Sequence, residues 1–187
     1  QDNAQAIIVG SQSTKSDIET HLGVGPERIR VVPYGVSPSY HPIPDSASVA
    51  RQIAGLGLEP GRYILHVGTI EPRKNLVRLV QAYARMREEL NERSVKLALV
   101  GALGWQSAPV LKTIELFGLE KEVVMTGPVP ADVLPALYNG AAVMVYPSLY
   151  EGFGLPPLEA MACGTPVVSS NVSSIPEVVG DAGLLVD

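Results

Sequence analysis

The sequence lacks several features that mark common classes of protein. Its single cysteine, Cys163, excludes a disulfide within the chain and fits a reducing compartment. No apolar run approaches the ~20 residues that a membrane-spanning helix needs. The net charge of −5 argues against a general nucleic-acid-binding surface. We therefore expect a cytoplasmic protein with no nucleic-acid partner.

An Asp-x-Asp pair, which could hold a divalent metal ion, is also absent from the sequence. We therefore expect no metal site and no separate cofactor. Basic side chains and a helix N-terminus would then have to neutralise any anionic ligand.

Apolar strands alternate with amphipathic helices from residue 63 onwards, and 46% of the chain is hydrophobic. Continuously apolar strands that alternate with helices are typical of a parallel sheet covered on both faces. The predicted fold class is therefore α/β, with a doubly wound, Rossmann-like parallel sheet. The predicted strands are residues 63–67, 95–100, 122–126, 143–146, 167–169 and 184–186, and the predicted helices are residues 75–92, 108–117, 132–138, 155–163 and 175–179.

The first part of the chain is organised differently. Residues 6–9 and 29–32 are predicted strands, and residues 14–22 are a predicted helix. Several prolines and a glycine then follow between residues 33 and 44, which is typical of a linker with fixed turns. We place a boundary near residue 43, with an N-terminal appendage before it.

The stretch from Tyr146 to Val168 reads as strand, glycine turn, helix, turn and strand, and it carries two carboxylates eight positions apart. Glu151 precedes the helix, and we expect Glu159 in its first turn. Gly152 and Gly154 would let a ligand approach the backbone, and a proline pair fits the helix start. An anion seat at a helix start, flanked by two acids, predicts a phosphorylated ligand that also carries hydroxyl groups.

A basic pair, Arg73-Lys74, follows the first predicted strand of this domain. Cations near a helix N-terminus are unfavourable, and a bound anion would relieve that conflict. Glycines at positions 68, 101 and 127 and a serine at 148 also follow strands directly. Ligands of open α/β sheets lie beyond the carboxyl ends of the strands, so these positions should converge on one crevice.

These elements together resemble the retaining glycosyltransferases of the GT-B fold, family 4 or "group 1". The resemblance covers essentially the whole chain. It is carried by three motifs in order. The first is Val67-Gly68-Thr69-Ile70-Glu71-Pro72-Arg73-Lys74-Asn75, and the second is Glu151-Gly152-Phe153-Gly154 followed by Glu159-Ala160-Met161-Ala162-Cys163-Gly164-Thr165-Pro166-Val167. The third is Pro176-Glu177-Val178-Val179-Gly180-Asp181-Ala182-Gly183-Leu184-Leu185-Val186.

The resemblance implies a role for each motif position. Arg73 and Lys74 would bind the donor diphosphate and stabilise it as it leaves, while Glu151 would face the donor hexose and Glu159 the ribose. Gly68, Gly127 and Val129 would line the donor site, with Val129 near the nucleobase. Backbone N–H groups of Gly152, Phe153, Gly154 and Leu155 would meet the sugar hydroxyls and phosphate.

The resemblance also implies the organisation and the substrates. Residues 1–43 would be the end of an acceptor-binding domain and the crossover, and residues 44–187 the nucleotide-sugar donor-binding domain, truncated at its C-terminal end. The sequences of the motifs are similar to those of bacterial mannosyltransferases. GDP-mannose is therefore the first expected donor and a UDP-hexose the second. The acceptor would be a glycan or lipid-linked, which implies peripheral association of the longer protein with the inner face of the cell membrane.

Two other functions are compatible with parts of the pattern. A retaining glycosidase could use Glu151 and Glu159 as its two carboxyl groups, although it would need no diphosphate site. A nucleotide-sugar-binding module without catalysis is the other alternative, and we expect it to describe the isolated chain, since half of the cleft would be absent.

Overall fold

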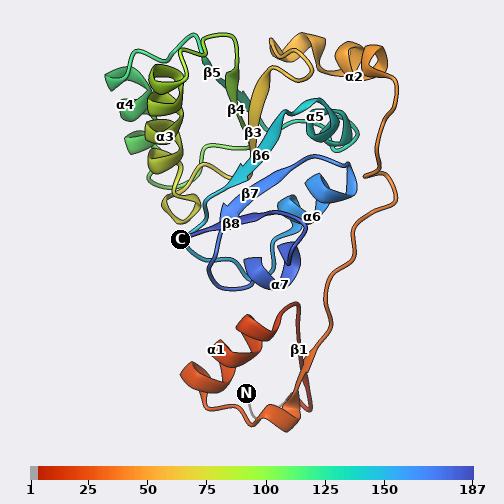
Figure 1. The fold of residues 1–187 in the computed structure, drawn as a ribbon. Coiled ribbons are helices and arrows are strands. Elements are labelled where there is room, and N and C mark those ends of the chain that lie inside the picture. Colours follow the sequence, from red (N-terminus) through yellow and green to blue (C-terminus); the bar gives the residue numbers. More distant parts are fainter. Residues whose placement is uncertain (1–3) are drawn as a thin grey trace.

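The computed structural model describes residues 4–187 and contains two separate parallel sheets (Figure 1). The strands are β1 (Ile7–Val9), β2 (Ile29–Val31), β3 (Tyr63–Val67), β4 (Lys96–Val100), β5 (Val123–Gly127), β6 (Val143–Tyr146), β7 (Val167–Ser170) and β8 (Leu184–Val186). The helices are α1 (Gln12–Leu22), α2 (Ser46–Ile53), α3 (Leu76–Glu89), α4 (Ala108–Leu116), α5 (Leu134–Gly140), α6 (Leu155–Ala162) and α7 (Ile175–Val179), with short 3₁₀ turns at Pro26–Arg28, Ala54–Leu56 and Pro72–Lys74.

The larger sheet has six parallel strands in the order β5-β4-β3-β6-β7-β8. The chain adds β4 and β5 on one side of β3, and then adds β6, β7 and β8 on the other side. This is the strand order of a Rossmann fold, so the predicted fold class is confirmed. The order reverses between β3 and β6, and ligands of such sheets bind beyond the carboxyl ends of the strands at that point.

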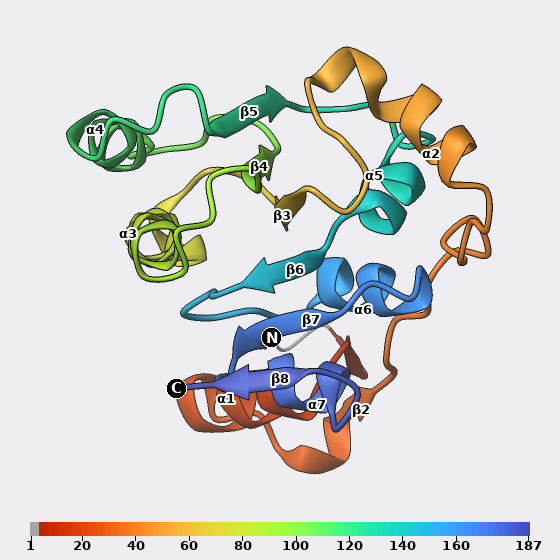
Figure 2. The ribbon, with the colours of Figure 1, turned by 45° about the horizontal axis from the view of Figure 1, so that its top comes forward.

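Helices cover both faces of this sheet (Figure 2). On one face, α3 and α4 bury their apolar side chains against residues such as Ile64 and Leu97. On the other face, α2, α5, α6 and α7 pack against residues such as Leu65 and Met144. Neighbours along one strand therefore point into different layers, which explains why the strands read as continuously apolar. The longest helix within residues 4–187, α3, has 14 residues, and none there is both long and apolar enough to cross a bilayer.

The predicted elements from residue 63 onwards are all present, with ends that differ by a few residues. One helix was missed. Asp45 caps α2 by accepting a hydrogen bond from the Ala47 N–H at 3.0 Å, and Val49 and Ile53 are buried. A capping residue followed by apolar residues four apart indicates a helix. The prolines between residues 33 and 44 indicated a linker, and no helix was predicted directly after it.

The N-terminal unit, residues 4–31, consists of α1 and the β1–β2 sheet around a small core of its own. Residues 32–45 contain neither helix nor strand and run along the outside of the larger domain to α2 (Figure 1). Asn139 in α5 fastens this linker, because its side chain accepts a hydrogen bond from the Ile43 N–H and donates one to the His41 carbonyl. The identity of residues 1–43 as the end of an acceptor-binding domain stays a prediction.

Candidate functional site

A cavity of about 370 Å³ lies beyond the carboxyl ends of β3 and β6, where the strand order reverses. It combines the turn after β3, the loop between β6 and α6, and one residue of the linker. Its lining residues are Tyr34, Gly68, Thr69, Arg73, Lys74, Tyr146, Glu151, Phe153, Gly154, Leu155 and Pro156. The predicted basic pair and the predicted sugar-facing carboxylate therefore share one hollow.

Three glycines mark the ends of three adjacent strands. The Gly68 N–H bonds the Val100 carbonyl, and the Gly101 N–H bonds the Gly127 carbonyl, so the ladder continues to these glycines. A Cβ on Gly101 would lie 2.1 Å from the Gly68 carbonyl oxygen, a distance that excludes any side chain there. The three glycines therefore end neighbouring strands, but of positions 68, 101, 127 and 148 only Gly68 lines the cavity.

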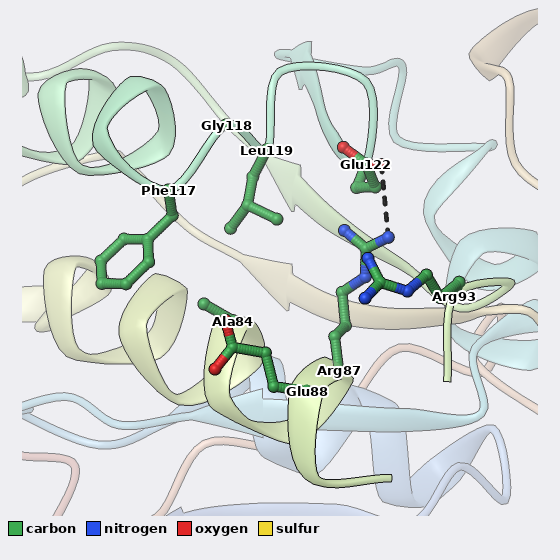
Figure 3. A pocket seen from close by; sticks show the side chains of 8 residues that line it. All are labelled: Ala84, Arg87, Glu88, Arg93, Phe117, Gly118, Leu119 and Glu122. Atoms are coloured by element: carbon green, nitrogen blue, oxygen red, sulfur yellow. Dashed lines mark hydrogen bonds and ion pairs between the residues drawn. The ribbon is translucent and has the colours of Figure 1, made fainter. Parts of the chain in front are cut away.

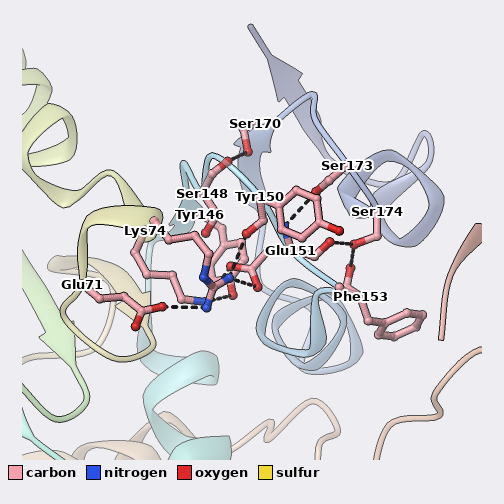
Figure 4. A network of polar contacts seen from close by, with 12 residues as sticks. Glu71, Lys74, Tyr146, Ser148, Tyr150, Glu151, Phe153, Ser170, Ser173 and Ser174 are labelled. Atoms are coloured by element: carbon pink, nitrogen blue, oxygen red, sulfur yellow. Dashed lines mark hydrogen bonds and ion pairs between the residues drawn. The ribbon is translucent and has the colours of Figure 1, made fainter. Parts of the chain in front are cut away.

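The centre of the site is one carboxylate held by two cations (Figure 4). Glu151 Oε1 lies 2.6 Å from Lys74 Nζ, and Glu151 Oε2 lies 2.7 Å from an Arg73 guanidinium nitrogen. Arg73 also pairs with Glu71 at 2.7 Å. Lys74 and Glu151 are buried, whereas the Arg73 side chain is 39% exposed. Arg73 is therefore the cation that an incoming anion meets first.

Glu71 and Glu151 also change the explanation for why Arg73 and Lys74 are tolerated near the start of α3. The sequence predicted that a bound anion would relieve the conflict between these cations and the start of α3. Glu71 and Glu151 already supply negative charge there. The pair is compatible with the fold without a ligand, so its ligand-binding role rests on its position in the cavity.

Burial and charge act against each other on these groups. Burial would raise the pKa of Glu151, but hydrogen bonding and charge from Lys74 outweigh it, and the pKa is lowered overall. Burial lowers the pKa of Lys74, and contact with Glu151 offsets only part of that effect. The Lys74 ammonium also donates to the Tyr146 hydroxyl at 2.6 Å. Burial, followed by the charge of Glu151, raises the pKa of Tyr146, so this phenol stays protonated beside the pair.

Two serines of the β7–α7 loop hold the backbone that carries Glu151 (Figure 4). The Glu151 N–H donates to Ser173 Oγ at 2.9 Å. The Ser174 hydroxyl lies 2.8 Å from the Glu151 carbonyl and 2.7 Å from the Phe153 carbonyl. The loop between β6 and α6 is therefore held in place by side chains about 20 residues away in sequence.

Glu159 lies elsewhere, and the prediction that it occupies the first turn of α6 is wrong. It is the fifth residue of α6, and its Oε2 accepts a hydrogen bond from the Tyr138 hydroxyl at 2.7 Å. Burial, followed by the charge and hydrogen bonding of Glu159, raises the pKa of Tyr40 to about 12. Glu159 thus faces α5 and the linker, and it does not line the cavity with Glu151.

The start of α6 offers fewer donors than a typical helix start. Leu155 begins the helix as predicted, but Pro156 and Pro157 have no N–H. The donors available to an anion are therefore the Leu155 amide and those of the preceding loop, residues 152–154.

Gly154 has φ +121°, a conformation that L side chains rarely adopt. Phe153 packs edge-on against Tyr34 with ring centroids 5.1 Å apart.

The matching family model, "Glycosyl transferases group 1", covers residues 50–187 and so most of the chain. The chain belongs to the group 1 glycosyltransferases. It is 41% identical, over its whole length, to O-antigen chain mannosyltransferase B of Escherichia coli, of which it covers 48%. It is 35% identical over 96% of its length to the serotype-specific mannosyltransferase WbdA of the same species, of which it covers 22%.

Solved structures agree with this membership. Alr3699/HepE of Anabaena, crystallised in complex with UDP and glucose, superposes with a TM-score of 0.83 at 25% identity. The superposition covers 97% of this chain and 49% of that one. The chain thus spans about half the length of Alr3699/HepE and of mannosyltransferase B.

Other residues of this group 1 glycosyltransferase chain occupy less central positions. Val129 packs against the core beside β5, and Trp105 is 62% exposed in its loop. Cys163 is buried, and burial raises the pKa of its thiol to about 11, which makes it a poor nucleophile. His66 is only partly satisfied, since its Nδ1 lies 3.0 Å from the Val145 carbonyl while Nε2 has no partner among residues 4–187.

The group 1 motifs did not reveal the tyrosines and serines that hold the two glutamates. Tyr146 could have been noticed as the last residue of a strand that points into the crevice. Tyr138, Ser173 and Ser174 approach only through the fold, so sequence spacing carries no sign of them.

A second hollow of about 130 Å³ lies at the other end of the sheet (Figure 3). It lies between the C-terminal end of α3 and the turn before β5, and it contains an ion pair between Arg87 and Glu122 at 3.3 Å. None of the predicted site residues lines it. Within residues 4–187, no group of three or more His, Cys, Asp or Glu side chains is placed to hold a metal ion.

Proposed function

We propose that this chain is the donor-binding half of a retaining glycosyltransferase that moves a hexose, with mannose favoured, from a nucleotide-diphosphate sugar. The observation that carries the proposal is the cavity at the reversal of strand order, where Arg73, Lys74 and Glu151 meet. Relatives named as mannosyltransferases support the choice of sugar. A structural neighbour crystallised with UDP and glucose supports a nucleotide-sugar ligand.

In this proposal the two cations serve the diphosphate. Arg73 offers a planar fork of N–H donors and Lys74 a point charge, a combination suited to phosphate oxygens. Negative charge grows on the diphosphate as the bond to the sugar breaks. Fixed cations in a partly dry cavity stabilise that charge more strongly than water does.

The two glutamates would divide the rest of the donor. Glu151 lies in the cavity and is assigned to the hexose. Glu159, on the side of α6 towards Tyr138, is assigned to the ribose diol. Gly68, Gly127 and Val129 would surround the nucleoside, and the amides of residues 152–155 would meet the hexose hydroxyls and phosphate.

The site is balanced in charge, because Glu71 and Glu151 offset Arg73 and Lys74. A diphosphate must therefore share or take over cations that already have partners. Arg73 is the accessible member, so its removal should weaken nucleotide binding directly.

The proposal is tested by calorimetry with GDP in excess EDTA, with UDP as the alternative base. We expect binding without added metal, and Arg73→Ala should weaken it by about 1.5–3 kcal/mol, the range for a hydrogen bond to a charged group. Arg93→Ala, an exposed arginine at the opposite end of the sheet, is the matched control. Binding that disappears with EDTA, or equal effects of the two variants, would refute the assignment.

The donor itself can be selected with a thermal-shift panel. GDP-mannose is the first candidate, since the named relatives are mannosyltransferases, and a UDP-hexose is the second. A larger stabilisation by ADP-sugars than by both of these would redirect the proposal.

We assign the acceptor to a longer protein of which this chain would be the donor-binding half. We propose a glycan or lipid-linked acceptor at the cytoplasmic face of the membrane, a choice supported by the relative named for the O-antigen chain. The isolated chain should transfer no sugar at a useful rate, because holding both reactants together provides effective molarities of roughly 10⁵–10⁸ M. With an α-linked donor, the longer protein should make an α-linked product, and an inverted linkage measured by NMR coupling constants would contradict retention.

The alternative of a retaining glycosidase is less well supported. Such an enzyme needs a protonated acid and a nucleophile about 5 Å apart across one bond. Glu151 is ion-paired with two cations that lower its pKa, and Glu159 does not line the same cavity. A binding module without catalysis fits the isolated chain, and a transfer assay on the longer protein distinguishes it from the enzyme.

A further inference from the structure

The backbone of residues 151–153 is held by hydroxyl groups from two different parts of the molecule. Ser173 and Ser174, on the donor side, hold the Glu151 peptide groups and the Phe153 carbonyl. The carbonyl between them, on Gly152, has different partners, and both come from the N-terminal unit.

These partners are Ser11 and Thr14 at the start of α1. Ser11 Oγ lies 2.8 Å and Thr14 Oγ1 lies 3.0 Å from the Gly152 carbonyl oxygen. A carbonyl oxygen has two lone pairs, so it can accept from both hydroxyls. Ser11 is 1% exposed, although Gly152 is exposed at the surface of its loop.

A third contact fixes α1 in this place. The two carboxylate oxygens of Glu177 in α7 accept hydrogen bonds from the Gln12 and Ser13 N–H groups, each at 2.7 Å. These are free donors at a helix N-terminus, where a negative charge is favourable. Figures 1 and 2 show α1 and α7 next to one another. Glu177 therefore sets the distance at which the two hydroxyls reach Gly152.

We propose that Ser11 and Thr14 are positioning residues that transmit docking of the N-terminal unit to the Glu151 carboxylate. Gly152 follows Glu151 directly and has no side chain to restrict its backbone. The serines of the β7–α7 loop fix the peptide groups of Glu151, and the hydroxyls of α1 fix the next one. With the N-terminal unit undocked, the Gly152 peptide loses both partners and the loop gains freedom next to Glu151.

This inference rests on the proposed function, because it assigns Glu151 to the hexose. It differs from a merely structural role of α1 in one measurable respect. A loosened Glu151 should affect a ligand that carries a hexose and leave the bare nucleotide unaffected. A general loss of packing would affect both ligands alike.

The test compares dissociation constants for GDP and GDP-mannose, with UDP and UDP-glucose as a second pair, in the 187-residue chain. Thr14→Val removes one hydroxyl at nearly constant shape. Thr14→Ser retains it and should restore wild-type behaviour. Thr20→Val is the matched control, since Thr20 is an exposed threonine on the same helix. Ser11 also caps α1 and is left intact for that reason.

We expect Thr14→Val to weaken binding of the sugar nucleotide about threefold to tenfold, the effect of one neutral hydrogen bond, with little change for the bare nucleotide. Glu177→Gln should act in the same direction from an exposed position, which keeps the test valid if Thr14→Val folds poorly. Equal effects on both ligands, or none on either, would overturn the inference. A wild-type chain that binds neither pair would instead overturn the proposed function.

Discussion

The two ends of the six-stranded sheet each contain a buried cation paired with a carboxylate, and the pairs are built differently. At the carboxyl ends of the strands, Glu151 is held by two cations at 2.6 and 2.7 Å. At the opposite end, Arg87 meets Glu122 once, at 3.3 Å, and its guanidinium lies over the Tyr83 ring. The first end surrounds its carboxylate with glycines and free loop amides. The second packs its arginine between two helices and a turn.

This difference indicates what separates a ligand site from a structural ion pair. A buried pair alone is poor evidence for either function or stability. At the carboxyl ends of the strands, Arg73, Lys74, Glu151 and the Tyr146 hydroxyl converge. Glycines line the same cavity, so a ligand can approach the backbone there. At the opposite end, one carboxylate pairs with one buried arginine, and the Nε of Arg87 has no hydrogen-bond partner among residues 4–187.

The largest effect should come from removing the buried cation of the first end. Lys74→Met leaves Glu151 buried with one partner, and we expect it to lower the free energy of unfolding by about 3 kcal/mol. Arg87→Met is the control at the other end and should cost clearly less, because Glu122 is 29% exposed and can be solvated. Urea unfolding of both variants makes the comparison. Equal losses would mean that the two pairs are equivalent.

Acid should also affect the first end strongly, through His66 on β3. Burial lowers the pKa of His66 from 6.5 to about 4. The unfolded chain therefore takes up this proton first, and stability present above pH 6.5 is lost as the pH falls towards 4, by about 3 kcal/mol. His66→Gln should remove this slope, and His21→Gln, at an exposed histidine, should keep it. Unfolding measured across that pH range, with the same slope in both variants, would exclude His66 as its cause.

The two glutamates provide a further test, because only Glu151 lies in the cavity at the first end. Glu159→Gln should weaken GDP binding by about 1.5–3 kcal/mol, because the ribose is present in every nucleotide. Glu151→Gln should not weaken GDP binding, since GDP carries no hexose and the substitution releases Arg73 and Lys74 to the diphosphate. Calorimetry on both variants decides the division of roles. Similar losses would show that both carboxylates serve the nucleotide.

The smallest expected effect distinguishes two tyrosines. Tyr138→Phe removes the hydrogen bond to Glu159, and Tyr83→Phe removes one to the Val95 carbonyl near the Arg87 end. Each should cost about 1 kcal/mol of stability. Only Tyr138→Phe should also reduce GDP affinity, since only Tyr138 orients a residue assigned to the ligand. A parallel loss of affinity in Tyr83→Phe would break the distinction between the ends.

Much of the fold could be predicted from the sequence because local patterns determine it. Continuously apolar strands such as β3 and β6 can only be buried on both faces, and their alternation with helices requires parallel pairing. The prediction failed at α2, where prolines in the linker obscured a cap and two apolar residues. It also misplaced Glu159: α6 begins at Leu155 as predicted, but about 3.6 residues per turn put the fifth residue of the helix beyond its first turn.

The site was predictable where it depends on the ends of strands and less so where it depends on tertiary contacts. Gly68, Arg73, Lys74 and Glu151 follow β3 and β6, so topology brings them together. The ion pairing among them could not be predicted, because it depends on side-chain reach across a turn. Tyr138 contacts Glu159 from a neighbouring helix, a relation that no spacing in the sequence records. The ligand roles of all these residues remain predictions.

The amide of Asn139 has a mechanical consequence. By its hydrogen bonds to the backbone of His41 and Ile43, it anchors the C-terminal end of the linker to α5. Any swing of the N-terminal unit must then pivot on the backbone of residues 32–40, a tether of roughly 30 Å when extended. Lengthening that tether with glycines would loosen the swing, whereas cutting the Asn139 anchor would move its pivot towards α2. One side chain on α5 thus sets the radius through which the N-terminal unit can move.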